Sequence, residues 1–301
     1  MKRNVCVLMS TYNGEKYLKE QIDSILNQKN VNVRLIVRDD GSKDATIDIL
    51  KEYENEKKLR WYNGKNLGPA KSFMDLVFNA DECDYYAFAD QDDFWMEDKL
   101  EKTLEKIGNN FTPMVAYCNA EIVNSKLESL NKLAYSNKQY NFYTLMCANY
   151  ILGCTMVFNN ALRKIIVDAG KPKNIVMHDA YLIRVCLAIG GQVIFNNKIE
   201  MKYRQHENNV MGIKINFPSK LKSFNKEIFK KSDITIDEQA DDLIEKYDQL
   251  ILNKNKKWMQ QVSMYRKCLW NRIRLACSMK ISFKSIKESL KFRMAILLGH
   301  R

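Results

Sequence analysis

Short apolar segments alternate with amphipathic segments through residues 5–89, and this alternation limits the fold more than any other feature of the chain. Four runs of four or five residues have the apolar character of buried strands, namely 5–9, 33–37, 59–62 and 85–89. Between them, apolar residues recur at helical spacing in 15–28, 44–53 and 69–79. Strands that alternate with helices form βαβ units. We therefore predict an α/β fold with a mostly parallel central sheet and helices on both faces.

Polar segments, three of which carry glycine, follow the predicted strands. They are Ser10-Thr-Tyr-Asn-Gly14, Asp39-Asp-Gly-Ser42, Asn63-Gly-Lys-Asn66 and Asp90-Gln-Asp-Asp93. Ligands of such sheets bind beyond the carboxyl ends of the strands, so we expect these segments to converge on one crevice. The absence of G-x-G-x-x-G after the first strand argues against a dinucleotide-binding dehydrogenase, and the sequence contains no Walker A motif.

Three carboxylates stand directly after the fourth predicted strand, in Asp90, Asp92 and Asp93. Like charges at this spacing repel and raise one another's pKa unless a cation lies among them. Hard ions such as Mg²⁺ and Mn²⁺ prefer oxygen ligands and complete their shell with water and substrate phosphates. The pattern indicates a metal–phosphate site, although a solvated acidic turn is the simpler interpretation of Asp-x-Asp alone.

The net charge of +12 is concentrated in the last part of the chain. Residues 1–213 contain 28 Lys and Arg against 27 Asp and Glu, whereas residues 249–301 contain 13 against one. We therefore predict a nearly neutral domain over 1–213 and a basic helical extension over 214–301. In the later part of the domain we expect strands at 153–158, 192–195 and 199–203, helices at 160–169 and 177–189, and an insertion over 120–150 with little clear period.

The composition narrows the class of protein. The eight cysteines are scattered without a C-x-x-C pair, which disfavours a cysteine zinc site and suits a reducing cytosol. The apolar run after Met1-Lys-Arg-Asn4 is too short for the core of a signal peptide. No uncharged apolar stretch reaches the length of a membrane-spanning helix. We expect a cytoplasmic location.

Six short motifs occur in the order in which one enzyme family carries them. They are Ser10-Thr-Tyr-Asn-Gly14, Asp39-Asp-Gly-Ser-Lys-Asp44, Asn66-Leu-Gly68, Asp90-Gln-Asp-Asp93, His178-Asp179 and Tyr203-Arg-Gln-His206. Together they resemble the family 2 glycosyltransferases of the GT-A fold, and most closely the bacterial rhamnosyltransferase-like branch that builds surface polysaccharides. The resemblance spans about residues 4–212. It does not extend to the tail.

The resemblance implies a metal-dependent hexosyltransferase that works with inversion. The donor would be dTDP-rhamnose or a UDP-hexose, the acceptor a hydroxyl of a growing, lipid-linked surface polysaccharide, and the cofactor Mn²⁺ or Mg²⁺. Asp90 and Asp92 look like metal ligands, and His206 and Asp93 compete for a third contact. Asp179 resembles the catalytic base, which takes the proton of the acceptor hydroxyl. Capping of a helix is the alternative role of Asp179.

The same resemblance divides the domain into a nucleotide-sugar half, about 1–95, and an acceptor half, about 96–213. On the nucleotide-sugar side it implies Thr11, Tyr12, Asn13, Asp39, Asp40, Asn66, Lys71, Asp90, Gln91 and Arg204. On the acceptor side it implies Trp95, Gly153 and His178. Asp39 and Asp40 have a second interpretation as a turn and helix cap, Tyr12 as a packing aromatic and Lys71 as a solvated helix residue. Glu207 stands where the family often carries glycine.

The tail has its own pattern, because apolar residues from Trp258 to Ala276 and again from Ile281 to Leu290 follow helical spacing with basic residues between them. A basic amphipathic helix can lie in a membrane interface, where each Lys or Arg near anionic lipid contributes about 1 kcal/mol. We expect attachment to the inner face of the plasma membrane. Packing of the tail on the body and homo-oligomerisation through it stay open.

Two other classes of function are weighed against the enzyme. A catalytically silent protein that binds nucleotide sugars or glycans would have the crevice without turnover, which the joint presence of Asp90, Asp92 and Asp179 disfavours. A nucleic-acid-binding protein would account for the basic tail, but the body is neutral and carries no RNA-binding signature.

Overall fold

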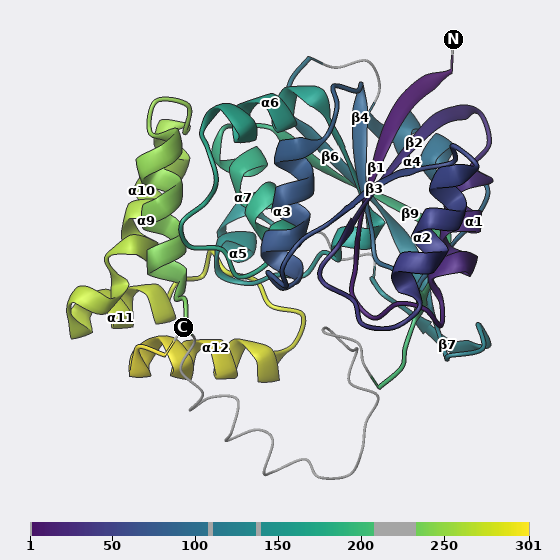
Figure 1. The fold of residues 1–301 in the computed structure, drawn as a ribbon. Helices are drawn as coiled ribbons and strands as arrows, with labels where there is room; N and C mark the ends of the chain where they lie inside the picture. The colour runs from purple at the N-terminus through teal and green to yellow at the C-terminus, as the bar shows by residue number, and fades with distance from the viewer. Residues whose placement is uncertain (1, 108–110, 137–139, 208–232, 301) are drawn as a thin grey trace.

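The computed structural model describes residues 2–107, 111–136, 140–207 and 233–300 (Figure 1). The described strands form one mixed sheet in the order β3–β2–β1–β4–β8–β6–β9–β5, with β7 paired to β6. The strands are β1 Arg3–Thr11, β2 Val31–Asp39, β3 Arg60–Asn63, β4 Tyr85–Ala89, β5 Phe94–Trp95, β6 Met114–Val123, β7 Ser129–Leu133, β8 Met156–Asn159 and β9 Gln192–Arg204. The predicted domain boundary at 213/214 lies outside the described residues.

The first four strands in the sequence are parallel, as the alternation of strands and helices predicts. β1 pairs in parallel with β2 and β4, and β2 pairs in parallel with β3. In this register Thr11 lies opposite Asp39, and Met9 lies opposite Ala89. The polar segments that follow these strands therefore leave the sheet at the same edge.

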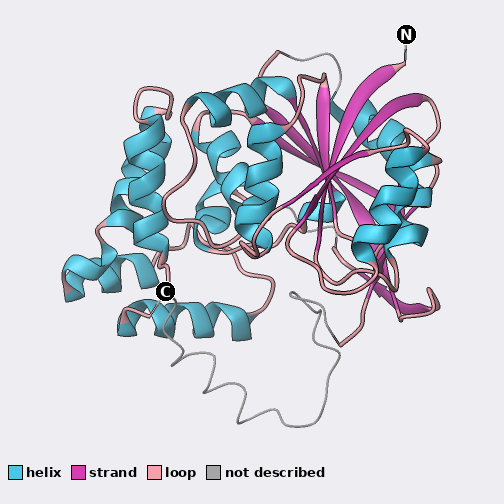
Figure 2. Ribbon diagram, viewed as in Figure 1, coloured by secondary structure: helices cyan, strands magenta, loops and turns pink. Residues whose placement is uncertain are grey.

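Helices cover both faces of the sheet, and this confirms the predicted α/β class (Figures 1 and 2). The helices of the body are α1 Leu18–Leu26, α2 Thr46–Asn55, α3 Pro69–Asn79, α4 Lys99–Ile107, α5 Phe142–Cys147, α6 Asn160–Asp168 and α7 His178–Ala188. In β1, Cys6 and Leu8 join the apolar cluster of α3 and α7, whereas Val5 and Val7 join that of α1 and α4. Because both faces are covered, consecutive strand residues are all apolar.

The structure differs from the predicted elements at several points. Residues 120–150 are not an irregular insertion, because they contain the end of β6, the strand β7 and the helix α5. The helix α4 and the strands β5 and β6 were not predicted, and the predicted strand 153–158 begins as a 3-10 turn before β8. The two predicted strands 192–195 and 199–203 are one strand, β9, whose register against β6 shifts beside Asn119.

The C-terminal part consists of α9 Ile236–Tyr247, α10 Asn253–Ser263, α11 Leu269–Ala276 and α12 Ile286–Leu298. The prediction of one basic amphipathic helix through Trp258 and Ala276 is wrong, since α10 ends at Ser263 and α11 begins at Leu269. Trp258 is buried in the cluster that contains α3 and α7, so this segment packs on the body. None of the described helices is long and apolar enough to cross a bilayer.

Candidate active site

A cavity of about 1060 Å³ lies at the strand ends where the polar segments meet. Among the predicted site residues, those that line it are Thr11, Tyr12, Asn13, Asp40, Asn66, Asp90, Gln91, Asp92, Gly153, His178, Asp179 and His206. The lining also contains residues that sequence reasoning missed, among them Tyr17, Asn124 and Asn149. One cavity therefore joins segments from both halves of the domain.

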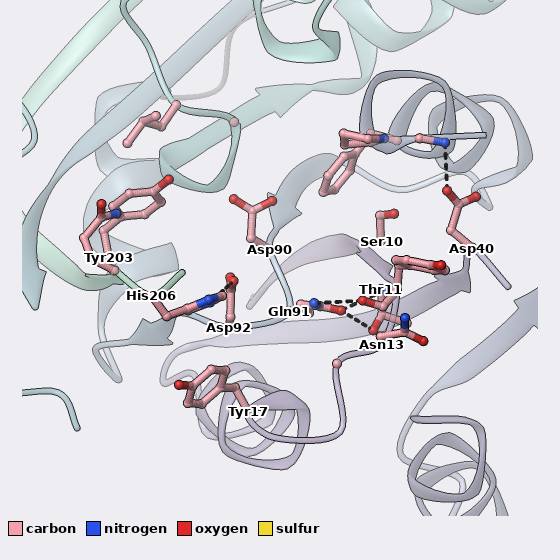
Figure 3. A pocket seen from close by; sticks show the side chains of 18 of the residues that line it. Ser10, Thr11, Asn13, Tyr17, Asp40, Asp90, Gln91, Asp92, Tyr203 and His206 are labelled. Atoms are coloured by element: carbon pink, nitrogen blue, oxygen red, sulfur yellow. Dashed lines mark hydrogen bonds and ion pairs between the residues drawn. The ribbon is translucent and has the colours of Figure 1, made fainter. Parts of the chain in front are cut away.

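Gln91 holds the loop after β1 in place (Figure 3). Its Oε1 accepts hydrogen bonds from Thr11 Oγ1 at 2.6 Å and from the backbone N–H of Tyr12 at 2.8 Å. Its Nε2 donates to the carbonyl of Tyr12 at 3.2 Å. A Cβ at Gly14 would come within 2.4 Å of Gln91 Oε1, so a larger residue there would displace the Gln91 amide. The β4 end thus fixes the backbone of the β1 end.

Asp40 organises a second part of the wall. It forms a buried ion pair with Arg38 and accepts the backbone N–H groups of Leu67 at 2.9 Å and Gly68 at 2.8 Å. Gly68 has φ +74°, a conformation that favours glycine. These bonds shape the segment that places Asn66 in the cavity wall.

Asp90, Asp92 and His206 face the cavity from the ends of β4 and β9 (Figure 3). His206 Nε2 lies 2.7 Å from Asp92 Oδ2. Burial, and next the charge of Asp92, raise the pKa of Asp90 to about 7. Two carboxylates and an imidazole form a donor set that can hold a divalent cation such as Mn²⁺.

Asp93 lies beneath this group rather than in the cavity wall. It is fully buried, its Oδ1 accepts the backbone N–H of Arg204 at 3.1 Å, and burial raises its pKa well above the usual range. Ligand atoms of Asp90, Asp93 and Cys154 lie within 4.8 Å of one another. Burial also raises the pKa of the Cys154 thiol, so this sulfur stays protonated and is a poor ligand for a hard ion.

Asp179 stands in the first turn of α7, and both of its carboxylate oxygens are held. Oδ1 accepts Asn149 Nδ2 at 2.8 Å and the backbone N–H of Ala180 at 2.6 Å, and Oδ2 accepts the N–H of Gly153 at 3.1 Å. Burial nevertheless raises the pKa of Asp179 to about 6. Asn149 was missed because it lies in the segment without a clear period.

His178 is buried beside Asp179. Its ring stacks on Phe73 with centroids 4.0 Å apart, and burial lowers the imidazole pKa to about 3, so the ring stays neutral. Within the described chain, neither ring nitrogen has a hydrogen-bond partner. A Cβ at Gly153 would lie 2.5 Å from His178 Nε2, so a larger residue there would displace the His178 ring.

Four predicted site residues do not line the cavity. Asp39 is fully buried, and its Oδ2 accepts the backbone N–H groups of Gly41 and Ser42, as its alternative role as a turn predicts. Trp95 is 1% exposed and packs under the Lys99 ammonium. Lys71 is exposed on α3. These three side chains lie outside the lining of the cavity, as does Arg204, so the structure does not bring them together with the other predicted site residues.

The buried side chain of Arg204 connects two loops and α1. Its Nε donates to the carbonyl of Asp92 at 2.7 Å, its Nη1 donates to the carbonyl of Ser125 at 2.7 Å, and its Nη2 pairs with Glu20. The guanidinium also lies 4.4 Å from the ring centroid of Tyr17. Its donors therefore hold the backbone at Asp92 and at Ser125 in place.

Arg204→Ala is expected to lower the free energy of unfolding by about 3 kcal/mol, because buried carbonyls lose their donors. Urea denaturation followed by circular dichroism measures this change. Arg60→Ala serves as the control, since its exposed pair with Asp81 should contribute less than about 1 kcal/mol. Equal losses in the two variants would contradict the structural role of Arg204.

The chain is similar in sequence to known glycosyltransferases. A family model described as "Glycosyl transferase family 2" matches residues 6–170. The dTDP-rhamnosyl transferase RfbG of Shigella flexneri is 29% identical over 229 residues, which cover 71% of this chain and 77% of the relative. A putative teichuronic acid biosynthesis glycosyltransferase, TuaG of Bacillus subtilis, is 38% identical over 103 residues, which cover 34% of this chain and 40% of the relative.

Solved structures show the same architecture. S. aureus TarS in complex with UDP-GlcNAc has a TM-score of 0.57 at 17% identity, over 99% of this chain and 89% of that one. The mannosyltransferase PcManGT of Pyrobaculum calidifontis, in complex with GDP-Man and Mn²⁺, has a TM-score of 0.53 at 12% identity, over 100% of this chain and 86% of that one. These similarities confirm the predicted GT-A fold.

Proposed function

Because the chain belongs to glycosyl transferase family 2, we propose that it is an inverting, metal-dependent enzyme that moves a sugar from a nucleotide diphosphate to a hydroxyl. The observation that carries this proposal is that Asp179 and the Asp90–Asp92 pair line one cavity. A single displacement needs a base on the acceptor side and positive charge beside the leaving diphosphate. This cavity offers groups for both.

Asp90, Asp92 and His206 would hold Mn²⁺ or Mg²⁺. Burial, and next the charge of Asp92, raise the pKa of Asp90, and a bound cation would favour its ionised form. We favour His206 over Asp93 as the third contact, because His206 lines the cavity and Asp93 is buried under it. When bound, the ion would stabilise negative charge on the departing nucleoside diphosphate.

Asp179 would take the proton of the acceptor hydroxyl. With a pKa of about 6 it is mostly ionised at neutral pH and close to the value that suits a general base. Asn149 and the N–H of Gly153 hold its two oxygens and so fix the direction of the free lone pairs. His178, which stays neutral, would orient the acceptor from the same helix end.

The other end of the cavity would receive the nucleotide. Thr11, Tyr12 and Asn13 would border the base and ribose, together with Asn66 and Asp40, which line the same cavity. Gln91 would act by holding the backbone of the first of these segments. This half ends near residue 95, and the acceptor half runs to about 213, where the C-terminal extension begins.

We propose dTDP-rhamnose or a UDP-hexose as the donor. The similarity to a dTDP-rhamnosyl transferase over 71% of the chain supports the first of these. The acceptor would be a lipid-linked saccharide of a surface polysaccharide, reached from the cytoplasmic face of the plasma membrane. Similarity to a putative teichuronic acid glycosyltransferase is consistent with such an acceptor.

A screen of nucleotide sugars tests the activity. The purified chain is incubated with dTDP-rhamnose, UDP-hexoses and GDP-mannose, each with Mn²⁺, Mg²⁺ or EDTA, and release of the nucleotide is measured. We expect one donor to stand out and EDTA to abolish its release. A chain that released no nucleotide from any donor, but bound one of them tightly, would be a silent binding protein.

Asn149→Ala is expected to move the acidic limb of the pH profile of kcat to higher pH by about one unit. Asn149 donates to the ionised carboxylate of Asp179, so its loss raises the pKa of that carboxyl. A base works in its ionised form, and activity therefore falls first at low pH. Asp90 and Arg184, the other charges that act on Asp179, stay in place. The measurement is kcat from pH 5 to 8.

The matched control for this change is Asn55→Ala, an exposed asparagine at the end of α2. It should leave the profile unchanged. If the acidic limb of the kcat profile were at the same pH in Asn149→Ala as in the unmodified enzyme, Asn149 would not be a positioning residue for the base.

A further inference from the structure

A stripe of large apolar side chains on α12 faces solvent. Ile286, Leu290, Met294 and Leu297 recur at helical spacing and are 82%, 53%, 43% and 40% exposed. The opposite side of the helix packs into the core through Ile296. We call the four exposed residues the α12 stripe. Exposed apolar surface that is gathered along one helix side marks an interaction site.

The neighbouring helix α11 also carries exposed apolar side chains. α11 packs on α12, and Arg272 Nη1 of α11 donates to the carbonyl of Leu297 at 3.4 Å (Figure 1). Leu269 and Trp270 on α11 are 63% and 78% exposed. Trp is favoured where an apolar phase meets water, because its ring is apolar and its N–H is polar.

The sequence that carries α11 and α12 is strongly basic. Residues 264–300 contain nine Lys and Arg, and Glu288 is their single acidic residue. Lys267, Arg274 and Lys284 are exposed beside the apolar residues in the sequence. A second copy of the chain would bring two such basic surfaces together, whereas an anionic lipid surface complements them.

The α12 helix is also joined to the acceptor side of the cavity. Glu288 Oε2 in its first turn accepts the hydroxyl of Tyr150 at 3.2 Å. Tyr150 follows Asn149, whose side chain donates to Asp179. Just before α12, the N–H of Ser282 donates to Thr144 Oγ1 at 2.8 Å. Only short contacts therefore separate α12 from the loop that holds the proposed base.

We propose that the α12 stripe, together with Trp270, docks the enzyme on an anionic membrane surface. The apolar side chains would enter the interface, and the surrounding Lys and Arg would lie at the lipid phosphates. Docking would bring the acceptor side of the cavity close to the lipid surface. The approach of the acceptor side to the lipid rests on the proposed function, whereas binding of the protein to lipid does not.

Co-sedimentation of the full chain with vesicles tests the proposal. We expect binding to vesicles of phosphatidylcholine with phosphatidylglycerol and little binding to phosphatidylcholine alone. Leu290→Ser with Met294→Ser should weaken partitioning at least tenfold, because burial of these side chains in the interface is lost. The matched control is Leu133→Ser with Ile199→Ser, which changes similarly exposed residues of β7 and β9.

A second variant tests the electrostatic contribution to vesicle binding. Lys267→Gln with Lys284→Gln should weaken binding to the anionic vesicles roughly twenty-fivefold, at about fivefold for each charge. Lys106→Gln with Lys198→Gln, exposed lysines of the body, is the control and should bind like the unmodified chain.

Three results would overturn the docking proposal. They are equal vesicle binding by the unmodified chain and the Leu290/Met294 variant, no preference for anionic lipid, and self-association that this variant abolishes without any lipid binding. Release of nucleotide from the donor is measured without lipid for each protein. Its presence shows an intact enzyme, and its absence from the unmodified chain would count against the proposed function and not against docking.

Discussion

Asp179→Asn is expected to lower kcat by about 10²–10⁴-fold and to leave the affinity for the donor nucleotide nearly unchanged. The asparagine has the size of the aspartate and keeps one oxygen to accept a hydrogen bond, but it cannot take up a proton. The side chain lies on the acceptor side, held by Asn149 and Gly153, away from the proposed nucleotide contacts. Nucleotide release measures kcat, and calorimetric titration measures donor affinity.

Asp168→Asn is the matched control, because Asp168 is exposed at the end of α6. It should turn over like the unmodified enzyme. Near-normal turnover by Asp179→Asn would show that Asp179 only shapes the start of α7. Loss of donor affinity together with turnover would point instead to a disrupted cavity.

Asp92→Ala is expected to lower kcat/KM by more than about a hundredfold and to remove its dependence on Mn²⁺. The change deletes a proposed metal ligand, and it takes away the carboxylate 2.7 Å from His206 Nε2. The remaining groups then hold the cation weakly. Kinetics across a Mn²⁺ titration measure the loss, and electron paramagnetic resonance of free Mn²⁺ measures binding directly.

Glu97→Gln controls for the removal of a nearby acidic charge, since Glu97 is exposed and pairs only at the surface with Lys29. It should bind Mn²⁺ like the unmodified enzyme. If Asp92→Ala also bound the ion as tightly as the unmodified enzyme, the assignment of Asp92 as a ligand would fail.

The fold was predictable from sequence where burial is complete. Residues 5–9 and 85–89 are apolar throughout because helices cover both faces of the sheet. β9 was divided into two strands because polar residues interrupt it at 196–198, beside the shift in register. β6 was not recognised since polar Asn119 and Glu121 stand near its end, and one of them is buried through hydrogen bonds that sequence does not display.

The sequence predicted where the site lies better than it predicted which side chains line it. Parallel strands bring their carboxyl ends together, so motifs at those ends had to meet. Which of two adjacent residues faces the cavity depends on the direction that each side chain takes in the folded loop. Asp40 and Asp92 line the cavity, whereas their neighbours Asp39 and Asp93 lie outside its lining. A sequence motif contains both residues of such a pair, so it does not show which of them lines the cavity.

The contact of α9 with α7 limits how the protein can be recombined with its relatives. The hydroxyls of Tyr181 and Tyr247 lie 2.9 Å apart, and Arg184 donates to Gln239 at 2.5 Å. A chimaera that exchanged everything after the family-like region would leave the buried Arg184 facing a foreign helix. A chimaera that takes α7 and α9 from the same parent would keep this buried contact, and we expect it to fold more stably than one that divides them.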